Sequence, residues 1–236
     1  MQLLVSVRNG HEASSALAGG ADIIDAKEPD AGPLGAVSVA ALCEIVCIVG
    51  GRRPVTAALG DAADEAAIEK AAAAFVQAGA ALVKVGFARI GERTRAQALL
   101  ASAARGAGAA RVIAVAYADY RRTASLSPLD ILSVAEAAGV AGVLIDTADK
   151  QGSPLRALVP APALAEWVSA VHRGGLLAAL AGKVAAEDIA ELRAAGADIV
   201  GVRGAACDGG RNGQVSAERI RSLRGPSPIG FHPIGV

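Results

Sequence analysis

Five lysines stand out in a chain whose other strongly basic residues are all arginine. Lys and Arg total 23, and 18 of these are Arg, which leaves Lys27, Lys70, Lys84, Lys150 and Lys183. An amine can lose its proton and attack a carbonyl carbon, whereas a guanidinium stays protonated. Each lysine is therefore a candidate for nucleophilic or proton-transfer chemistry. The alternative is that a GC-rich genome favours Arg codons.

Two aspartate–lysine pairs recur among these residues. Asp25 and Lys27 are two apart in IIDAK, so they share one face of an extended strand. Asp146 and Lys150 are four apart in DTADK. Lys84 lies in the apolar run LVKVG, where an unpaired buried charge is costly. We expect Lys84 to be an activated base or nucleophile, or else half of a structural ion pair. Asp25 is expected to hold the ammonium of Lys27 or of Lys84.

Eight short apolar runs, each followed by a helical pattern, must position these side chains. The runs are nearly continuous, which is typical of parallel strands covered on both faces. Several helical segments end in a glycine signal such as AGGAD or RAAGAD. Eight such units predict an α/β fold, a single (β/α)8 TIM barrel over 1–224, followed by a Pro/Gly-rich, irregular tail over 225–236. An open doubly wound sheet is the alternative, but SVRNGHE after the first run is not the GxGxxG that it requires. The expected strands are 3–7, 22–27, 55–59, 81–87, 112–118, 142–146, 176–181 and 198–202, and the expected helices are 11–18, 37–49, 64–78, 92–105, 129–138, 163–172, 186–195 and 216–223.

A barrel brings most of the lysines to one end. Catalytic groups of such barrels lie at the C-terminal ends of the strands. Four of the five lysines fall there or inside a strand, and only Lys70 falls on a surface helix. Amines and carboxylates around one mouth indicate imine chemistry on a carbonyl substrate. A neutral lysine would add to the carbonyl, the protonated imine would act as an electron sink, and a second lysine or a carboxylate would move protons.

The loops after strands seven and eight predict a phosphate site. They read AGK at 181–183 and VRGAACDGG at 202–210. Backbone N–H groups of Gly-rich loops at this place in a barrel often hold a phosphate. Arg203 would add a forked cation. The expected ligand therefore carries a phosphate group.

The remaining candidates carry less weight. Cys43 and Cys47 are four apart on a helix and are expected in the core, whereas Cys207 could line the site. Tyr117 and Asp119 end strand five and are candidates to bind substrate. The three histidines have no metal-ligand spacing, so we expect no metal and no cofactor.

The composition excludes several classes of protein. The chain is 53% hydrophobic and 19% charged, and its net charge is zero. It can therefore bury a large core, which argues against disorder, and it lacks the positive charge of a typical nucleic-acid binder. Three cysteines do not make a disulfide framework. No apolar run approaches the roughly 20 residues of a membrane span, and MQLLVSVRNG is not a signal peptide. We expect a cytoplasmic protein without membrane or nucleic-acid partners that forms a homo-oligomer.

Several motifs together resemble one enzyme family. The stretches LLVSV, AGGADIIDAKEP, VKVG, YAD, LIDTADKQG, ALAG and DIVGVRGAAC extend from the first expected strand to the eighth. They resemble the (5-formylfuran-3-yl)methyl phosphate synthase family of methanofuran biosynthesis, found in methanogenic archaea and methylotrophic bacteria. The resemblance implies a carbon–oxygen lyase that condenses two molecules of glyceraldehyde 3-phosphate into a furan aldehyde phosphate, with loss of phosphate and water. The Ala- and Arg-rich composition favours a methylotroph as the source.

The resemblance also implies roles for individual residues. Lys27, in IIDAK, would form the Schiff base, and Lys84, in VKVG, would accept a proton. Asp146 and Lys150, in DTADK, would assist proton transfer and elimination.

Other residues are assigned to substrate binding. The resemblance implies that Gly182, Arg203 and Gly204 hold the phosphate. Asp25 and Asp119 are further substrate-binding candidates from their strand positions.

The chain departs from the family pattern at Lys183 and in the tail after Leu223, which is longer and more Pro-rich than expected of archaeal relatives. Lys183 follows ALAG where a small polar residue is expected, so the resemblance implies no catalytic role for it.

Two alternative functions remain open. One is a different Schiff-base aldolase, which would share the chemistry of Lys27, and the other is a barrel that binds a phosphosugar without turnover.

Overall fold

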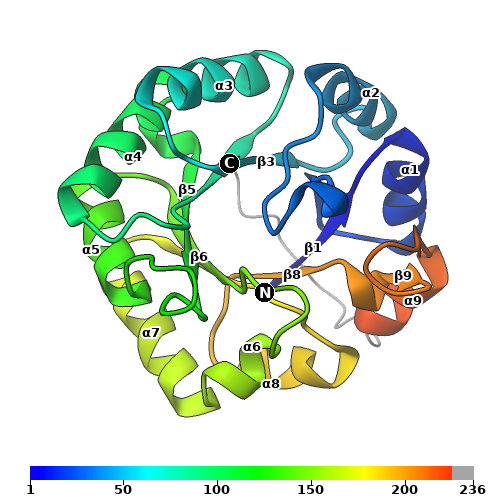
Figure 1. The fold of residues 1–236 in the computed structure, drawn as a ribbon. Coiled ribbons are helices and arrows are strands. Elements are labelled where there is room, and N and C mark those ends of the chain that lie inside the picture. Colours follow the sequence, from blue (N-terminus) through cyan, green and yellow to red (C-terminus); the bar gives the residue numbers. More distant parts are fainter. Residues whose placement is uncertain (225–236) are drawn as a thin grey trace.

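Eight parallel strands close into a barrel in the computed structural model, which describes residues 1–224 (Figure 1). Each strand pairs with its neighbour in the sequence, and β8 pairs back with β1. This confirms the predicted single (β/α)8 barrel. The strands are β1 (Gln2–Val7), β2 (Ile23–Ala26), β3 (Val55–Asp61), β4 (Leu82–Gly86), β5 (Val112–Tyr117), β6 (Gly142–Asp146), β7 (Leu177–Leu180) and β8 (Ile199–Val202).

The helices form a ring around the barrel (Figure 1). None among residues 1–224 is long and apolar enough to cross a membrane. The helices are α1 (Gly10–Gly19), α2 (Val39–Val49), α3 (Glu65–Gln77), α4 (Arg93–Ala107), α5 (Pro128–Ala138), α6 (Leu155–Leu158), α7 (Ala161–Arg173), α8 (Ile189–Ala194) and α9 (Ala217–Arg224).

Helix ends follow local sequence signals, as α5 illustrates. The Ser127 hydroxyl accepts a hydrogen bond from the backbone N–H of Asp130, and Pro128 occupies the first helical position. Gly139 ends the helix in the left-handed conformation, with φ of 61°. The chain then enters β6 three residues later. Short caps of this kind keep each strand close to the helix before it.

The apolar side chains form two separate layers. The larger layer lies between the strands and the helices and consists mainly of Val, Leu, Ile and Ala. The smaller layer fills the barrel interior, because every second strand residue points inward. Its members include Leu4, Leu82, Ile113, Leu144 and Ile199. Polar residues that point into this interior must therefore lie above an apolar floor.

Some details differ from the expected elements. The expected helix over 186–195 is a 3₁₀ turn over Ala186–Asp188 followed by α8, and the short α6 was not predicted. A two-stranded hairpin, β9 (Cys207–Asp208) and β10 (Gln214–Val215), follows β8. The expected tail over 225–236 lies outside the described residues.

The expectation that Cys43 and Cys47 belong to the core is wrong. Both are exposed. Helix α2 buries Leu42, Ile45 and Val49 against the barrel, and this spacing turns the two cysteines outward.

Candidate active site

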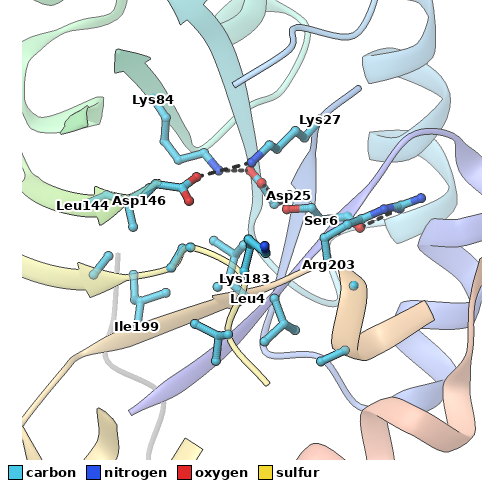
Figure 2. A pocket seen from close by; sticks show the side chains of 18 of the residues that line it. Leu4, Ser6, Asp25, Lys27, Lys84, Leu144, Asp146, Lys183, Ile199 and Arg203 are labelled. Atoms are coloured by element: carbon cyan, nitrogen blue, oxygen red, sulfur yellow. Dashed lines mark hydrogen bonds and ion pairs between the residues drawn. The ribbon is translucent and has the colours of Figure 1, made fainter. Parts of the chain in front are cut away.

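A cavity of about 460 Å³ extends from the C-terminal ends of the strands into the barrel. Its floor consists of apolar residues such as Leu4, Leu144 and Ile199. Above the floor lie charged side chains that come from different strands, and Figure 2 shows Lys27, Lys84, Asp25 and Asp146 converging on one region. The cavity thus contains the lysines and carboxylates that the sequence places at the mouth. Its polar members in this region are Ser6, Asp25, Lys27, Thr56, Lys84, Asp146 and Lys150.

Both carboxylate oxygens of Asp25 have polar partners, which come from β1, β3 and β4. The sheet register places Ser6 of β1 and Thr56 of β3 beside it. The two hydroxyls donate to its two carboxylate oxygens, at 2.9 and 2.7 Å. Lys84 Nζ lies 2.5 Å from Asp25 Oδ1. Of the two partners considered for Asp25, the structure shows Lys84.

Asp146 is shared between the other two lysines. Its Oδ1 accepts from Lys150 Nζ at 2.6 Å and from the Thr147 backbone N–H at 2.7 Å. Its Oδ2 lies 3.6 Å from Lys27 Nζ, which is beyond hydrogen-bond distance. Lys27 follows directly on β2 and is 7% exposed. Lys27 is therefore the least strongly paired of the three amines.

The electrostatics of the pocket favour a neutral Lys27. Burial lowers the pKa of Lys27 from 10.5 to about 7, and Lys150 and Lys84 add to this effect while Asp146 opposes it. Burial alone would raise the pKa of Asp146, but the ammonium groups of Lys150 and Lys27 hold it at about 2. The site therefore combines an amine that is partly neutral near pH 7 with an ionised carboxylate. Such a pair can form an imine and move protons.

The loops after β7 and β8 form one side of the mouth. Gly182, at φ of 111°, is in a conformation that favours glycine, and a Cβ there would lie 2.9 Å from Thr147 Cγ2. Lys183 has φ of 55° and donates to the Gly152 carbonyl. Gly182, Lys183 and Gly204 all line the cavity. The loops thus bring backbone groups and one ammonium to the place where a phosphate was expected.

Arg203 lines the cavity, but its guanidinium is held by protein acceptors. Both terminal nitrogens bind the buried carboxylate of Glu12. The Ser6, Arg211 and Gly213 carbonyls accept the remaining bonds at 2.9–3.0 Å. These contacts account for all five N–H donors of an arginine. A direct bond to phosphate would require one of them to break.

Asp119 and Tyr117 lie at the end of β5 but are not among the cavity-lining residues. Both carboxylate oxygens of Asp119 accept backbone N–H groups of the loop after β6. The Tyr117 hydroxyl donates to Asp61 at 2.7 Å. Burial raises the pKa of Tyr117 well above its usual value, and Asp61 adds to this effect. Both residues therefore contact protein groups rather than the cavity.

Several residues of the site were missed in the sequence. Ser6 and Thr56 are partners of Asp25, Glu12 is the partner of Arg203, and Arg211 lines the mouth. The inward alternation of β1 and β3 could have indicated Ser6 and Thr56. Glu12 and Arg203 lie 191 positions apart, so no local pattern connects them.

Cys207, a candidate to line the site, is instead part of the outer apolar layer. It is 1% exposed and pairs with Val215 in the hairpin. Burial raises the pKa of its thiol, so it lacks the thiolate character of a nucleophile.

Comparison with solved structures shows the same fold at low sequence identity. The chain matches the crystal structure of 3-hexulose-6-phosphate synthase with a TM-score of 0.60 and 20% identity, over 94% of this chain and 99% of that chain. It matches orotidine 5'-phosphate decarboxylase from Pyrococcus horikoshii with a TM-score of 0.63 and 16% identity, over 94% and 96% of the two chains. At these identities the likeness concerns the barrel alone.

Similarity in sequence is more specific. A (5-formylfuran-3-yl)methyl phosphate synthase of Methanosarcina mazei is 38% identical over 230 residues, covering 94% of this chain and 97% of that protein. The protein of the same name from Methanopyrus kandleri is 39% identical over 233 residues, covering 94% and 97%. The profile of a family described as 4-HFC-P synthase matches residues 3–224. The chain therefore belongs to the 4-HFC-P synthase family.

Proposed function

We propose that this chain is a (5-formylfuran-3-yl)methyl phosphate synthase, which condenses two molecules of glyceraldehyde 3-phosphate through a Schiff base on Lys27. The observation that carries the proposal is the weakly paired, buried Lys27, whose pKa of about 7 leaves much of the amine neutral near neutrality. Relatives of that name align over nearly the whole chain. The product would serve the synthesis of a methanofuran-type carrier.

The reaction begins at the amine of Lys27. Its lone pair attacks the aldehyde carbon of one triose phosphate, and loss of water gives a protonated imine. The imine withdraws electrons from the adjacent carbon, so a C–H proton there can be removed. Loss of that proton expels the phosphate from C3 of the bound triose and leaves C3 as an enol-type carbon nucleophile. C3 then attacks the C2 carbonyl of the second triose phosphate, isomerised to its ketone, and forms the carbon–carbon bond.

Later steps need proton donors and acceptors near Lys27. Lys84 and Asp146 face it within the cavity, and Lys150 is bonded to Asp146. We assign these groups to proton transfer and to the eliminations that follow. Ring closure and dehydration then release, by atom balance, two net water molecules in addition to the phosphate, and hydrolysis of the final imine gives the formyl group and returns the amine. The dehydrated ring is flat and apolar, which suits the floor of the cavity.

The substrate phosphates bind at the mouth in this proposal. Gly182 and Gly204 supply backbone groups beside Lys183 and Arg211, all of which line the cavity. Arg211 is partly held by the loop after β2, because its Nη2 donates to the Pro29 and Gly32 carbonyls. We assign the cationic contacts to Lys183 and Arg211, and we assign Arg203 to holding the loops in place.

Borohydride trapping tests the proposal. The protein is incubated with glyceraldehyde 3-phosphate, reduced with borohydride and mapped by peptide mass spectrometry. We expect a stable adduct on Lys27, and none in a Lys27→Met variant. Absence of an adduct on Lys27 in the active wild-type protein would contradict the imine mechanism.

A second measurement identifies the product. Incubation with glyceraldehyde 3-phosphate alone should release phosphate and generate the absorbance of a furan aldehyde. An adduct on Lys27 without phosphate release would instead indicate an aldolase with another product. Binding without an adduct or turnover would indicate a non-catalytic phosphosugar-binding barrel.

A further inference from the structure

The loop after β6, residues 147–152, carries Lys150 but has little helix or strand structure of its own. Its conformation determines where the Lys150 ammonium lies. That ammonium donates to Asp146 Oδ1 at 2.6 Å and approaches Thr147 Oγ1 at 3.4 Å. Lys150 therefore keeps its place only while the loop keeps its shape.

Two carboxylates organise the backbone of this loop. Asp119, 7% exposed at the end of β5, accepts the N–H of Ala148 on one oxygen and that of Asp149 on the other, both at 2.8 Å. Asp149 Oδ1 in turn accepts the N–H groups of Gln151 and Gly152, at 2.9 and 3.0 Å. Only the first carboxylate comes from outside the loop, so it attaches the loop to the neighbouring strand.

The position of Lys150 affects Lys27 through their shared carboxylate. Asp146 gives its closest contact to Lys150 and lies 3.6 Å from Lys27. If Lys150 moved away, Lys27 would lose a nearby cation and gain a fuller share of the Asp146 charge. Both changes stabilise the protonated amine. A displaced loop would therefore leave less of Lys27 in the reactive, neutral form.

We propose that Asp119 is a positioning residue that keeps Lys27 reactive, because it fixes the loop on which Lys150 competes with Lys27 for Asp146. Asp119 acts without touching the cavity. The inference rests on the proposed role of Lys27 as the reacting amine.

Other charges around Lys27 come from all sides of the barrel. The nearest are on its own strand and on β4 and β6, and more distant ones lie on the loops at the mouth. They are Asp25, Lys84, Asp146, Lys150, Lys183, Arg203, Arg211 and Arg219. The variants used to test the proposal leave all of these residues unchanged, apart from one comparison that is made in a Lys150→Met background.

The test measures protonation of Lys27 in the enzyme without substrate. Trace labelling with acetic anhydride across pH, followed by peptide mass spectrometry, gives the midpoint at which Lys27 becomes reactive. In Asp119→Asn, the amide oxygen can accept only one of the two N–H groups, and the amide nitrogen faces the other. We expect the midpoint to move upward by about one pH unit.

The sign of the shift separates positioning from a direct charge effect. Removing the negative charge of Asp119 would, by itself, lower the midpoint of a nearby lysine. The proposal predicts the opposite direction. The same reasoning applies to Asp149→Ala, a substitution at a side chain that is 34% exposed and that loosens the same loop. This second variant decides the question if Asp119→Asn does not fold.

The matched control is Asp22→Asn. Asp22 also accepts a backbone N–H, that of Leu3, but at the N-terminal end of the barrel. In Asp22→Asn, the pH midpoint for labelling of Lys27 should equal that of the wild-type protein. In a Lys150→Met background, Asp119→Asn should add no further shift.

An unchanged or lowered midpoint in folded Asp119→Asn would overturn the proposal, as would an equal shift in Asp22→Asn. These outcomes are independent of turnover. A wild-type midpoint near 10 would instead contradict the proposed function, because Lys27 would then be protonated at neutral pH.

Discussion

Three amines meet two carboxylates among buried side chains in the cavity. Asp25 binds Lys84 and two hydroxyls, and Asp146 accepts hydrogen bonds from Lys150 and from the Thr147 backbone N–H. Lys27 is left at 3.6 Å from its carboxylate. When one of the three ammonium groups loses a proton, two positive charges face the two carboxylates. The amine with the weakest ion pair loses its proton most easily. The unequal number of amines and carboxylates thus favours Lys27 as the neutral amine, which is the basis for proposing it as the nucleophile.

This protonation predicts the pH dependence of turnover. In the proposed mechanism the neutral amine reacts, so kcat/KM for glyceraldehyde 3-phosphate should fall tenfold per pH unit below about pH 7, the pKa of Lys27. Lys27→Arg keeps a positive charge but cannot become neutral, so turnover should fall by about 10³-fold or more at every pH. Phosphate release measures both effects. The control is Lys70→Arg on the exposed face of α3, and a Lys27→Arg variant with near-normal activity would contradict the prediction.

At the scale of elements, Arg203 holds three parts of the mouth together. From the end of β8 it binds Glu12 on α1, the Ser6 carbonyl of β1, and two carbonyls near the β9–β10 hairpin. A lysine keeps the charge but lacks the planar fork, so Arg203→Lys should lower the free energy of unfolding by roughly 2–4 kcal/mol. Denaturant unfolding measures this loss. Arg219→Lys, which alters an exposed pair with Asp208, should cost less than about 1 kcal/mol. Unchanged stability with a large rise in KM would instead assign Arg203 to the phosphate.

The elements were largely predictable because their signals are local. Continuous apolar runs and glycine caps predicted all eight strands in order, and the barrel then placed Lys27, Lys84 and Lys150 around one mouth. Which lysine pairs with which carboxylate was harder to predict from the sequence. That Lys84 contacts Asp25 depends on the stagger of β2, β3 and β4, and residue spacing alone left Lys27 as an equal choice. The ion pair of Arg203 with Glu12 depends on α1, which lies near the other end of the sequence.

Side chains with two plausible environments were the most difficult to predict. Cys43 and Cys47 are apolar enough for a core, but the position of α2 on the barrel decides which of its faces is buried. Asp119 sits where a substrate ligand was expected, and only the course of the next loop shows that it binds backbone N–H groups. These outcomes depend on tertiary contacts, which a single sequence does not contain.

For the whole molecule, a buried amine of low pKa lowers stability. The folded chain holds Lys27 at a pKa of about 7, below its ordinary value of 10.5. Between these two pH values the unfolded chain binds a proton that the folded chain does not, so stability should rise with pH across this interval. Below about pH 7 both states carry the proton and the full cost of burying Lys27 remains. The burial that keeps Lys27 partly neutral therefore also destabilises the fold.

Lys27→Met should consequently make the inactive protein more stable. Methionine fills a similar volume without an ionisable group, and Asp146 keeps Lys150 as its partner at 2.6 Å. At about 1.4 kcal/mol per pH unit, we expect a gain of roughly 2–4 kcal/mol at pH 7, which should shrink steadily towards pH 10. Thermal or denaturant unfolding of both proteins from pH 6 to pH 10 measures the difference. Lys70→Met on the exposed side of α3 should show no such pH dependence, because that amine titrates alike in both states. A gain that stayed constant up to pH 10 would mean that Lys27 is not held neutral by burial, and it would remove the physical basis for its role as the nucleophile.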